Sequence, residues 1–111
     1  MIVVTSDQIP GKKITKTIGM VRGGTVRGKH IGKDILAFFR NLVGGEIDEY
    51  TKMLAESREQ ALDRMIQNAK HLDANAIVCT RYASSEIASG AAEVFVYGTA
   101  VVFEEDADSV D

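Results

Sequence analysis

The chain has 111 residues, the usual size of one domain, and its 45% hydrophobic and 26% charged residues are ordinary for a globular protein. This composition excludes a disordered chain, and the longest apolar runs are too short to span a bilayer. The single cysteine, Cys79, excludes an internal disulfide, and the N-terminus lacks the basic segment of a secretory signal. We therefore expect a cytoplasmic protein with no membrane contact.

The net charge of −3 conceals a strong asymmetry along the chain. Residues 12–40 carry eight basic side chains against one acidic one, whereas the last eight residues carry five acidic side chains. This pattern fits an anionic partner, and it fits a head-to-tail contact between copies equally well. It does not favour nucleic acid, because the sequence pI is about 5.4 and the basic segment has only Phe38 and Phe39 as stacking aromatics.

The first half of the chain predicts two strands, a glycine-rich connection and a short helix. β-Branched residues predict strands at 2–5 and 14–21, separated by the turn signal Pro10-Gly11. The glycines that begin with Gly23 and Gly24 exclude a regular helix there and indicate a turn, a bulge or a close backbone approach. Helical periodicity then appears over residues 33–43 and ends at Gly44-Gly45.

The second half predicts one long helix and two long strands. Apolar residues recur every three or four positions over 46–72, with acidic residues at the start and Lys70-His71 at the end, as the helix dipole favours. Strands follow at 77–82 and 93–103, joined by a turn at 88–91.

The last of these strands is apolar on both faces, so both faces should be covered. The long helix covers one face, and the other needs a second subunit or the short helix. We expect one domain over residues 1–105 and an acidic, frayed tail over 106–111.

A glycine-rich basic motif, Gly23 to His30, nearly matches a phosphate-binding P-loop. His30 stands where a P-loop has Ser or Thr, and no repeated β-α units follow. The backbone amides of this stretch, Gly28 included, and the side chains of Arg22, Arg27 and Lys29 are an anion-binding candidate. The alternative, which we favour, is a connection with solvated basic side chains.

Candidate metal ligands are few. Cys79, His30 and His71 are the soft or imidazole ligands of the chain, and they show none of the spacings typical of metal sites. His71 is explained more simply by the helix dipole, and Cys79 by burial in a strand. A site shared between subunits stays open.

Residues spread over nearly the whole chain carry a family resemblance. The most specific segments are Ala74-Asn75-Ala76 and Tyr97-Gly98-Thr99-Ala100-Val101 taken together. With them, the chain resembles the YbjQ-like family of small bacterial and archaeal proteins, which is labelled as heavy-metal-binding. The other matching residues are Gly19, Val26-Arg27-Gly28, Asp34, Gly44-Gly45, Tyr50, Arg58, Ala61 and Arg81.

The resemblance implies an α+β fold with a two-layer, dodecin-like β-α-β-β unit, extra N-terminal strands and one long helix on an antiparallel sheet. It also implies a ring-shaped homo-pentamer. At two positions the chain departs from the family pattern: Asp73 stands where Gly usually precedes Ala-Asn-Ala, and Cys79 where a small residue, often Gly, is common. Structural or subunit-contact roles are expected for Asp34, Gly44, Gly45, Asn75, Tyr97, Gly98 and Thr99.

The polar residues that match the family pattern can have either of two roles, as Arg81 illustrates. An arginine that positions elements by an ion pair is structural, whereas one that holds a carboxylate or phosphate binds a ligand. We favour the structural use and keep Arg81 as an anion-binding candidate.

The sequence therefore predicts a ring-forming homo-oligomer, more readily a binding protein than an enzyme, that holds a small ligand or ion at subunit interfaces or in a central channel. One alternative is a heavy-metal-binding protein with Cys79 and a histidine from a neighbouring subunit as ligands. Another is an enzyme that acts on an anionic substrate held by Arg27 and Lys29. The sequence requires no cofactor and leaves a bound metal open.

Overall fold

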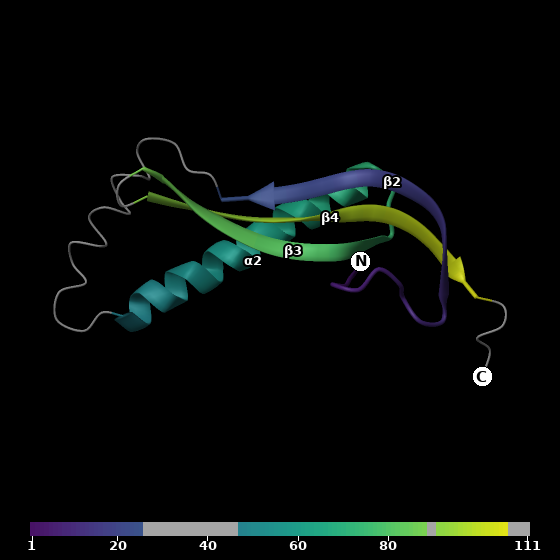
Figure 1. Ribbon diagram of the computed structural model, residues 1–111, viewed down its shortest axis with the longest axis horizontal. Coiled ribbons are helices and arrows are strands. Elements are labelled where there is room, and N and C mark those ends of the chain that lie inside the picture. The colour runs from purple at the N-terminus through teal and green to yellow at the C-terminus, as the bar shows by residue number, and fades with distance from the viewer. Residues whose placement is uncertain (26–46, 89–90, 107–111) are drawn as a thin grey trace.

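The computed structural model describes residues 1–25, 47–88 and 91–106, in which one long helix packs on a four-stranded sheet (Figure 1). The three longest strands are neighbours in the order β3-β4-β2 and run antiparallel, and the short β1 lies parallel to β3. The predicted α+β class with one long helix is confirmed, but the sheet is mixed rather than wholly antiparallel. The elements are β1 (Ile2–Val3), β2 (Lys12–Gly24), α2 (Ile47–His71), β3 (Ala76–Ala88) and β4 (Ala91–Glu105).

The core between α2 and the sheet is built from small side chains on the helix. Ala61, Met65 and Ala69 are fully buried and lie four residues apart, so they form one stripe facing the sheet. They pack against a cluster that includes Val21, Ile77, Val96 and Ala100. The small alanines let the helix lie close to the strands.

Gly23 of β2 marks the closest approach of helix and sheet. A Cβ added at Gly23 would overlap the Ala61 carbonyl oxygen and the Met65 amide nitrogen of α2. Both atoms belong to the helix backbone and cannot rotate away. The absence of a side chain at position 23 is therefore a packing requirement.

The C-terminus of α2 ends in a left-handed turn at Asp73. The Asp73 amide donates to the Lys70 carbonyl at 3.0 Å, and the Ala74 amide donates to the Ala69 carbonyl at 3.1 Å. This pair of bonds is the Schellman motif, which needs a left-handed residue, and Asp73 has a φ of 63°. Gly would adopt this conformation at lower cost.

A second cluster lies on the other face of the sheet. Ile9, Ala76, Val78 and Val101 are buried there, with Ile2, Val4, Ile14, Cys79 and Phe103 packed around them. Ile9 belongs to the segment between β1 and β2, so this segment covers one end of the face. From the sequence we expect another subunit or the short helix as the cover, whereas at this end of the face the cover is a segment of the same chain.

Three predicted features fall outside the described residues, wholly or in part. These are the short helix over 33–43, the centre of the turn at 88–91 and the end of the acidic tail. Within the described residues, α2 lacks the long apolar run that a membrane-spanning helix needs.

Candidate functional site

The strands place a row of side chains on the sheet face opposite α2. Val96 of β4 packs into the core beneath α2, so the side chain of the next residue, Tyr97, points to the opposite face. Tyr97 is paired in register with Arg81 of β3 and with Arg22 of β2. Directly opposite residues share a face. Tyr97 therefore stands in a three-strand row between two arginines.

The surroundings of this row are open and partly apolar. Met20 of β2 has 75% of its surface exposed, and Tyr97 has 38%. The Phe95 ring lies 6.1 Å from the Tyr97 ring, centroid to centroid. A shallow hollow beside the row is lined by Arg22, Gly23, Gly24, Glu93 and Phe95. We call the residues Met20, Arg22, Arg81, Phe95, Tyr97 and Thr99 the Tyr97 face.

A β-bulge in β3 sets the register of the row. The pairing of β3 with β4 shifts between Val78 and Arg81, and Cys79 within it has a φ of 56°. The amides of Cys79 and Thr80 point outward and donate to the carbonyls of Ser6 and Val4, at 2.9 and 3.0 Å. The bulge thus fastens the N-terminal segment to the sheet, and it aims Arg81 at the face that carries Tyr97.

Arg81 itself makes structural bonds. Its Nη1 donates to the Thr5 carbonyl at 2.9 Å and to the Thr80 carbonyl at 2.8 Å. The guanidinium therefore clamps the N-terminal segment onto β3. Because a guanidinium carries five N–H donors, Arg81 keeps donors that these two bonds do not use.

Of the three metal-ligand candidates, the two that the structure describes do not lie together. Cys79 packs against the second cluster, on the face away from α2. His71 lies at the exposed end of α2, where its Nδ1–H donates to the Gln67 carbonyl at 2.7 Å. The sheet separates the two residues, and His30 lies outside the described residues. No group of three potential ligands occurs in the part of the chain that the structure describes.

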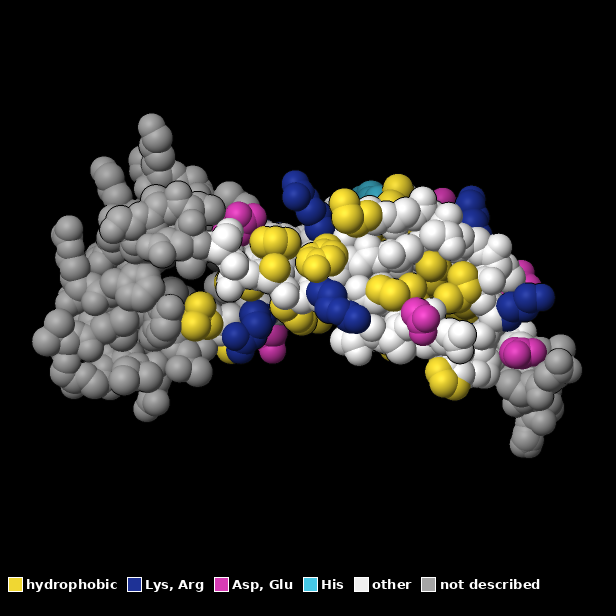
Figure 2. Space-filling view, viewed as in Figure 1, with side chains coloured by type: hydrophobic (Ala, Val, Ile, Leu, Met, Phe, Trp, Pro, Cys, Tyr) yellow, Lys and Arg dark blue, Asp and Glu magenta, His cyan; other side chains and the backbone are white. Residues whose placement is uncertain are grey.

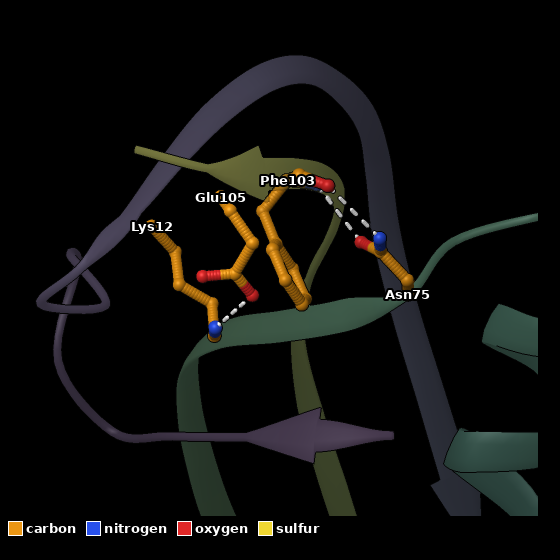
Figure 3. A network of polar contacts seen from close by, with 4 residues as sticks. All are labelled: Lys12, Asn75, Phe103 and Glu105. Carbon is orange, nitrogen blue, oxygen red and sulfur yellow. Dashed lines mark hydrogen bonds and ion pairs between the residues drawn. The ribbon is translucent and has the colours of Figure 1, made fainter. Parts of the chain in front are cut away.

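Asn75 closes the end of the sheet (Figure 3). Its Nδ2 donates to the Phe103 carbonyl at 3.0 Å, and its Oδ1 accepts from the Phe103 amide at 2.9 Å. The Asn75 side chain thus bonds the backbone of β4 and closes the corner between α2 and β3. Lys12 forms an ion pair with Glu105 and lies 5.1 Å from the centroid of the Phe103 ring. This corner is structural.

Gly98 lies on the face of the sheet that packs against α2. A Cβ at this position would lie 2.7 Å from Ile77 Cγ2 and 3.0 Å from the Val78 carbonyl oxygen. Thr99 is paired with Val78 and with Met20, so it belongs to the Tyr97 face. Of the predicted site residues, four come together: Arg22, Arg81, Tyr97 and Thr99.

The P-loop-like motif lies only in part within the described residues. Gly23 and Gly24, the start of the P-loop-like motif, lie in the antiparallel strand β2, whereas a P-loop follows a parallel strand. The remaining candidates of the first half lie outside the described residues; they are Arg27, Gly28, Lys29, His30, Asp34, Gly44 and Gly45.

Sequence reasoning missed Met20 and Phe95. The alternation of β4 could have indicated Phe95, because it lies two residues before Tyr97 and shares its face. Met20 could not be found in this way, because its position depends on two irregularities in the pairing of β2 with β4, between Ile14 and Lys16 and between Thr17 and Gly19.

Comparison with known proteins gives consistent matches over most of the chain. A family model, YbjQ_1, described as "Putative heavy-metal-binding", matches residues 1–104. A UPF0145 protein of Clostridioides difficile is 51% identical over 106 residues, which cover 96% of this chain and 95% of the relative. A UPF0145 protein of Pyrococcus furiosus is 56% identical over 106 residues, covering 96% and 93%.

A solved structure gives a weaker likeness. It is a protein of unknown function of the DUF74 family from Pediococcus pentosaceus, with 17% sequence identity and a TM-score of 0.49. The match covers 96% of this chain and 98% of that chain.

Proposed function

The chain belongs to the YbjQ_1 family, and from this premise we propose that it assembles into a ring-shaped homo-oligomer, a pentamer, that holds a small ligand or ion between subunits or in the central channel. In this proposal the ligand site forms only when the subunits assemble. The proposal includes the dodecin-like arrangement of the β-α-β-β unit.

The observation that carries this proposal is that, among the described strands, both edges of the sheet are long and largely unpaired. β2 forms one edge over Lys12–Gly24, and within the described residues no strand pairs with its outer side. At the other edge, β1 pairs with β3 only at its start, and in the part of the chain that the structure describes no strand lies beside β3 from Tyr82 to Ala88. Unpaired edge amides and carbonyls are a template for another strand. Pairing an edge of one copy with an edge of the next would close a ring.

The Tyr97 face supports the same assembly. Hydrophobic side chains reach the surface along the middle of the molecule (Figure 2), and Met20 and Tyr97 are among the exposed ones. Covering such side chains removes apolar area from water, which stabilises an interface. The arginines of this face, at positions 22 and 81, would then lie at a subunit boundary, where they suit an anionic ligand.

The charge asymmetry fits a head-to-tail contact in part. Lys12 and Glu105 already pair within one chain. Lys13 and Glu104 lie opposite each other in the register of β2 and β4, and Lys16 lies nearby on β2; all three are exposed, and among the described residues none forms an ion pair. They can therefore complement charges on a neighbouring copy.

Native mass spectrometry of freshly purified, untagged protein tests the proposal. The subunit mass is 12.1 kDa, so a bare pentamer has five times this mass, and a bound ligand appears as an additional constant mass. Dilution should dissociate the assembly without passing through a stable dimer. A chain that stays monomeric at micromolar concentration contradicts the proposal.

The family description favours a second function, the binding of a heavy-metal ion. Cys79 is the soft ligand of the chain, and thiolates prefer soft metals. One cysteine and no ligand cluster in the described part of a chain do not make a site. A site therefore requires Cys79 from several subunits, or Cys79 with His30 or His71 of a neighbour.

Elemental analysis separates this second function from the first. The untagged protein is dialysed against Cd²⁺ and then against buffer, and the retained metal per subunit is measured. Metal binding predicts a fixed ratio that Cys79→Ser abolishes while the native mass of the assembly stays the same. If no metal is retained, or if Cys79→Ser retains as much, the metal function is wrong.

A further inference from the structure

A cleft opens where α2 diverges from the sheet. The helix crosses the strands at an angle, and its N-terminal half separates from the ends of β3 and β4 (Figure 1). The gap holds a cleft of about 270 Å³ lined by Leu54, Arg58, Tyr82, Ala83, Ser84 and Val94. All six residues belong to one chain, and the cleft lies on the opposite side of the sheet from the Tyr97 face.

Polar donors converge on this cleft from two elements. Tyr82 is paired with Val96, and Ser84 with Val94, so both side chains lie on the face that α2 covers. Arg58 reaches the same cleft from the helix. Among the described residues, none of these three side chains has a hydrogen bond or an ion pair. The cleft therefore offers a guanidinium and two hydroxyl groups that are free to bind.

The remaining lining is apolar. Leu54 on the helix is half-buried, and Val94 on β4 is buried. A binding pocket typically combines apolar walls with a few placed polar groups. Here the cation and the hydroxyls can hold an oxyanion, while Leu54, Val94 and the Tyr82 ring can contact an uncharged body.

We propose that this cleft binds a small organic carboxylate with an apolar body. The Arg58 guanidinium would bind the carboxylate through two parallel hydrogen bonds, the geometry that suits this pair of planar groups. Tyr82 and Ser84 would donate to the same oxygens. The volume limits the ligand to about the size of an aromatic or branched acid, because drug-sized ligands need pockets of roughly 300 Å³ or more.

Benzoate is the probe, and saturation-transfer NMR with titration measures its affinity for the full chain at millimolar concentration. We expect benzoate to bind, benzyl alcohol to bind at least about 10-fold more weakly, and Arg58→Met to weaken benzoate by about 10-fold, as loss of a charge-assisted pair should. Lys70→Met is the control, since it removes a cation from the same helix three turns away and should leave the affinity unchanged.

Two further variants test the hydroxyl donors of the cleft. Tyr82→Phe and Ser84→Ala keep the shape of the cleft and should each reduce benzoate affinity several-fold, with circular dichroism verifying the fold of every variant. The proposal is overturned if the unmodified chain does not bind benzoate, or if Arg58→Met binds it as well as Lys70→Met does. Preference for inorganic phosphate over benzoate would also overturn it, since the apolar walls would then have no role. Because the cleft lies within one chain, benzoate binding does not require the ring, and native mass spectrometry tests the ring independently.

Discussion

Cys79 adopts a left-handed backbone conformation, with a φ of 56°, inside the bulge of β3. This conformation costs an L-residue roughly 1–2 kcal/mol, whereas Gly adopts it freely. Asp73 is the other described non-glycine residue with a positive φ. The resemblance implies Gly at position 73 and a small residue, often Gly, at position 79, so these expected departures coincide with the two positive φ values.

We predict that Cys79→Gly is more stable than Cys79→Ala by about 1 kcal/mol. Both changes remove the thiol and its packing against the second cluster, so their difference isolates the backbone conformation. Urea unfolding at one fixed protein concentration measures it, because assembly makes the midpoint concentration-dependent. If the alanine variant is equally stable, the bulge relaxes without Gly, and strain at Cys79 is not the explanation of the pattern.

The hydroxyl group of the neighbouring residue, Thr80, carries a different cost, that of burial without a hydrogen bond among the described residues. Thr80 is 4% exposed, and among the residues that the structure describes its Oγ1 has no hydrogen-bond partner. A buried unsatisfied hydroxyl costs about 1–3 kcal/mol. We expect Thr80→Val, which keeps the shape, to raise the free energy of unfolding by about 1 kcal/mol, and Thr80→Ser to lower it. A destabilised valine variant in a thermal melt would show that the hydroxyl does have a partner in solution.

At the scale of elements, the contact between α2 and β2 depends on Gly23. A methyl group at this position must push the helix backbone outward, because the overlapping atoms are the Ala61 carbonyl and the Met65 amide. We predict that Gly23→Ala destabilises the fold by about 3 kcal/mol or more, the upper part of the range for overpacking. Lys16→Arg, an exposed change in the same strand that keeps the charge, should stay within about 0.5 kcal/mol. Similar urea midpoints for the two variants would mean that the helix shifts at little cost.

The long elements could be predicted because their signals are local. The helical stripe of Ala61, Met65 and Ala69 and the apolar run of β4 are visible in the sequence itself. The extension of β3 from Ala83 to Ala88 could not be predicted, because Ala and Ser favour strands weakly and this stretch is a strand through its pairing with β4. The parallel contact of β1 with β3 could not be predicted either, because it joins residues more than seventy positions apart in the sequence.

At the scale of the molecule, the candidate site was only partly predictable. Arg81 and Tyr97 were identified as single residues, but their position beside Arg22 depends on the bulge in β3 and on the irregular register of β2. A shift of one residue would turn a side chain to the other face. The sequence therefore identifies single site residues, but which of them lie side by side depends on the pairing of the strands.

The assembly makes its sharpest prediction at Met20. This side chain is 75% exposed in one chain and lies on the Tyr97 face, so a subunit contact there would bury it. Replacing Met20 with Lys would then place a charge in an apolar contact and cost several kcal/mol per subunit boundary. We expect Met20→Lys to shift the native mass spectrum from the pentamer to the monomer while the circular dichroism spectrum stays the same.

Leu72→Lys is the matched control for Met20→Lys. Leu72 is also an exposed large apolar residue, at 47%, but it lies just after the C-terminal end of α2 and away from the Tyr97 face. Its replacement should leave the pentamer intact, because Lys near a helix C-terminus is compatible with the dipole. Dissociation by Leu72→Lys alone would move the interface to the helix side of the sheet. A pentamer that survives Met20→Lys would show that the strand edges hold the ring without the Tyr97 face.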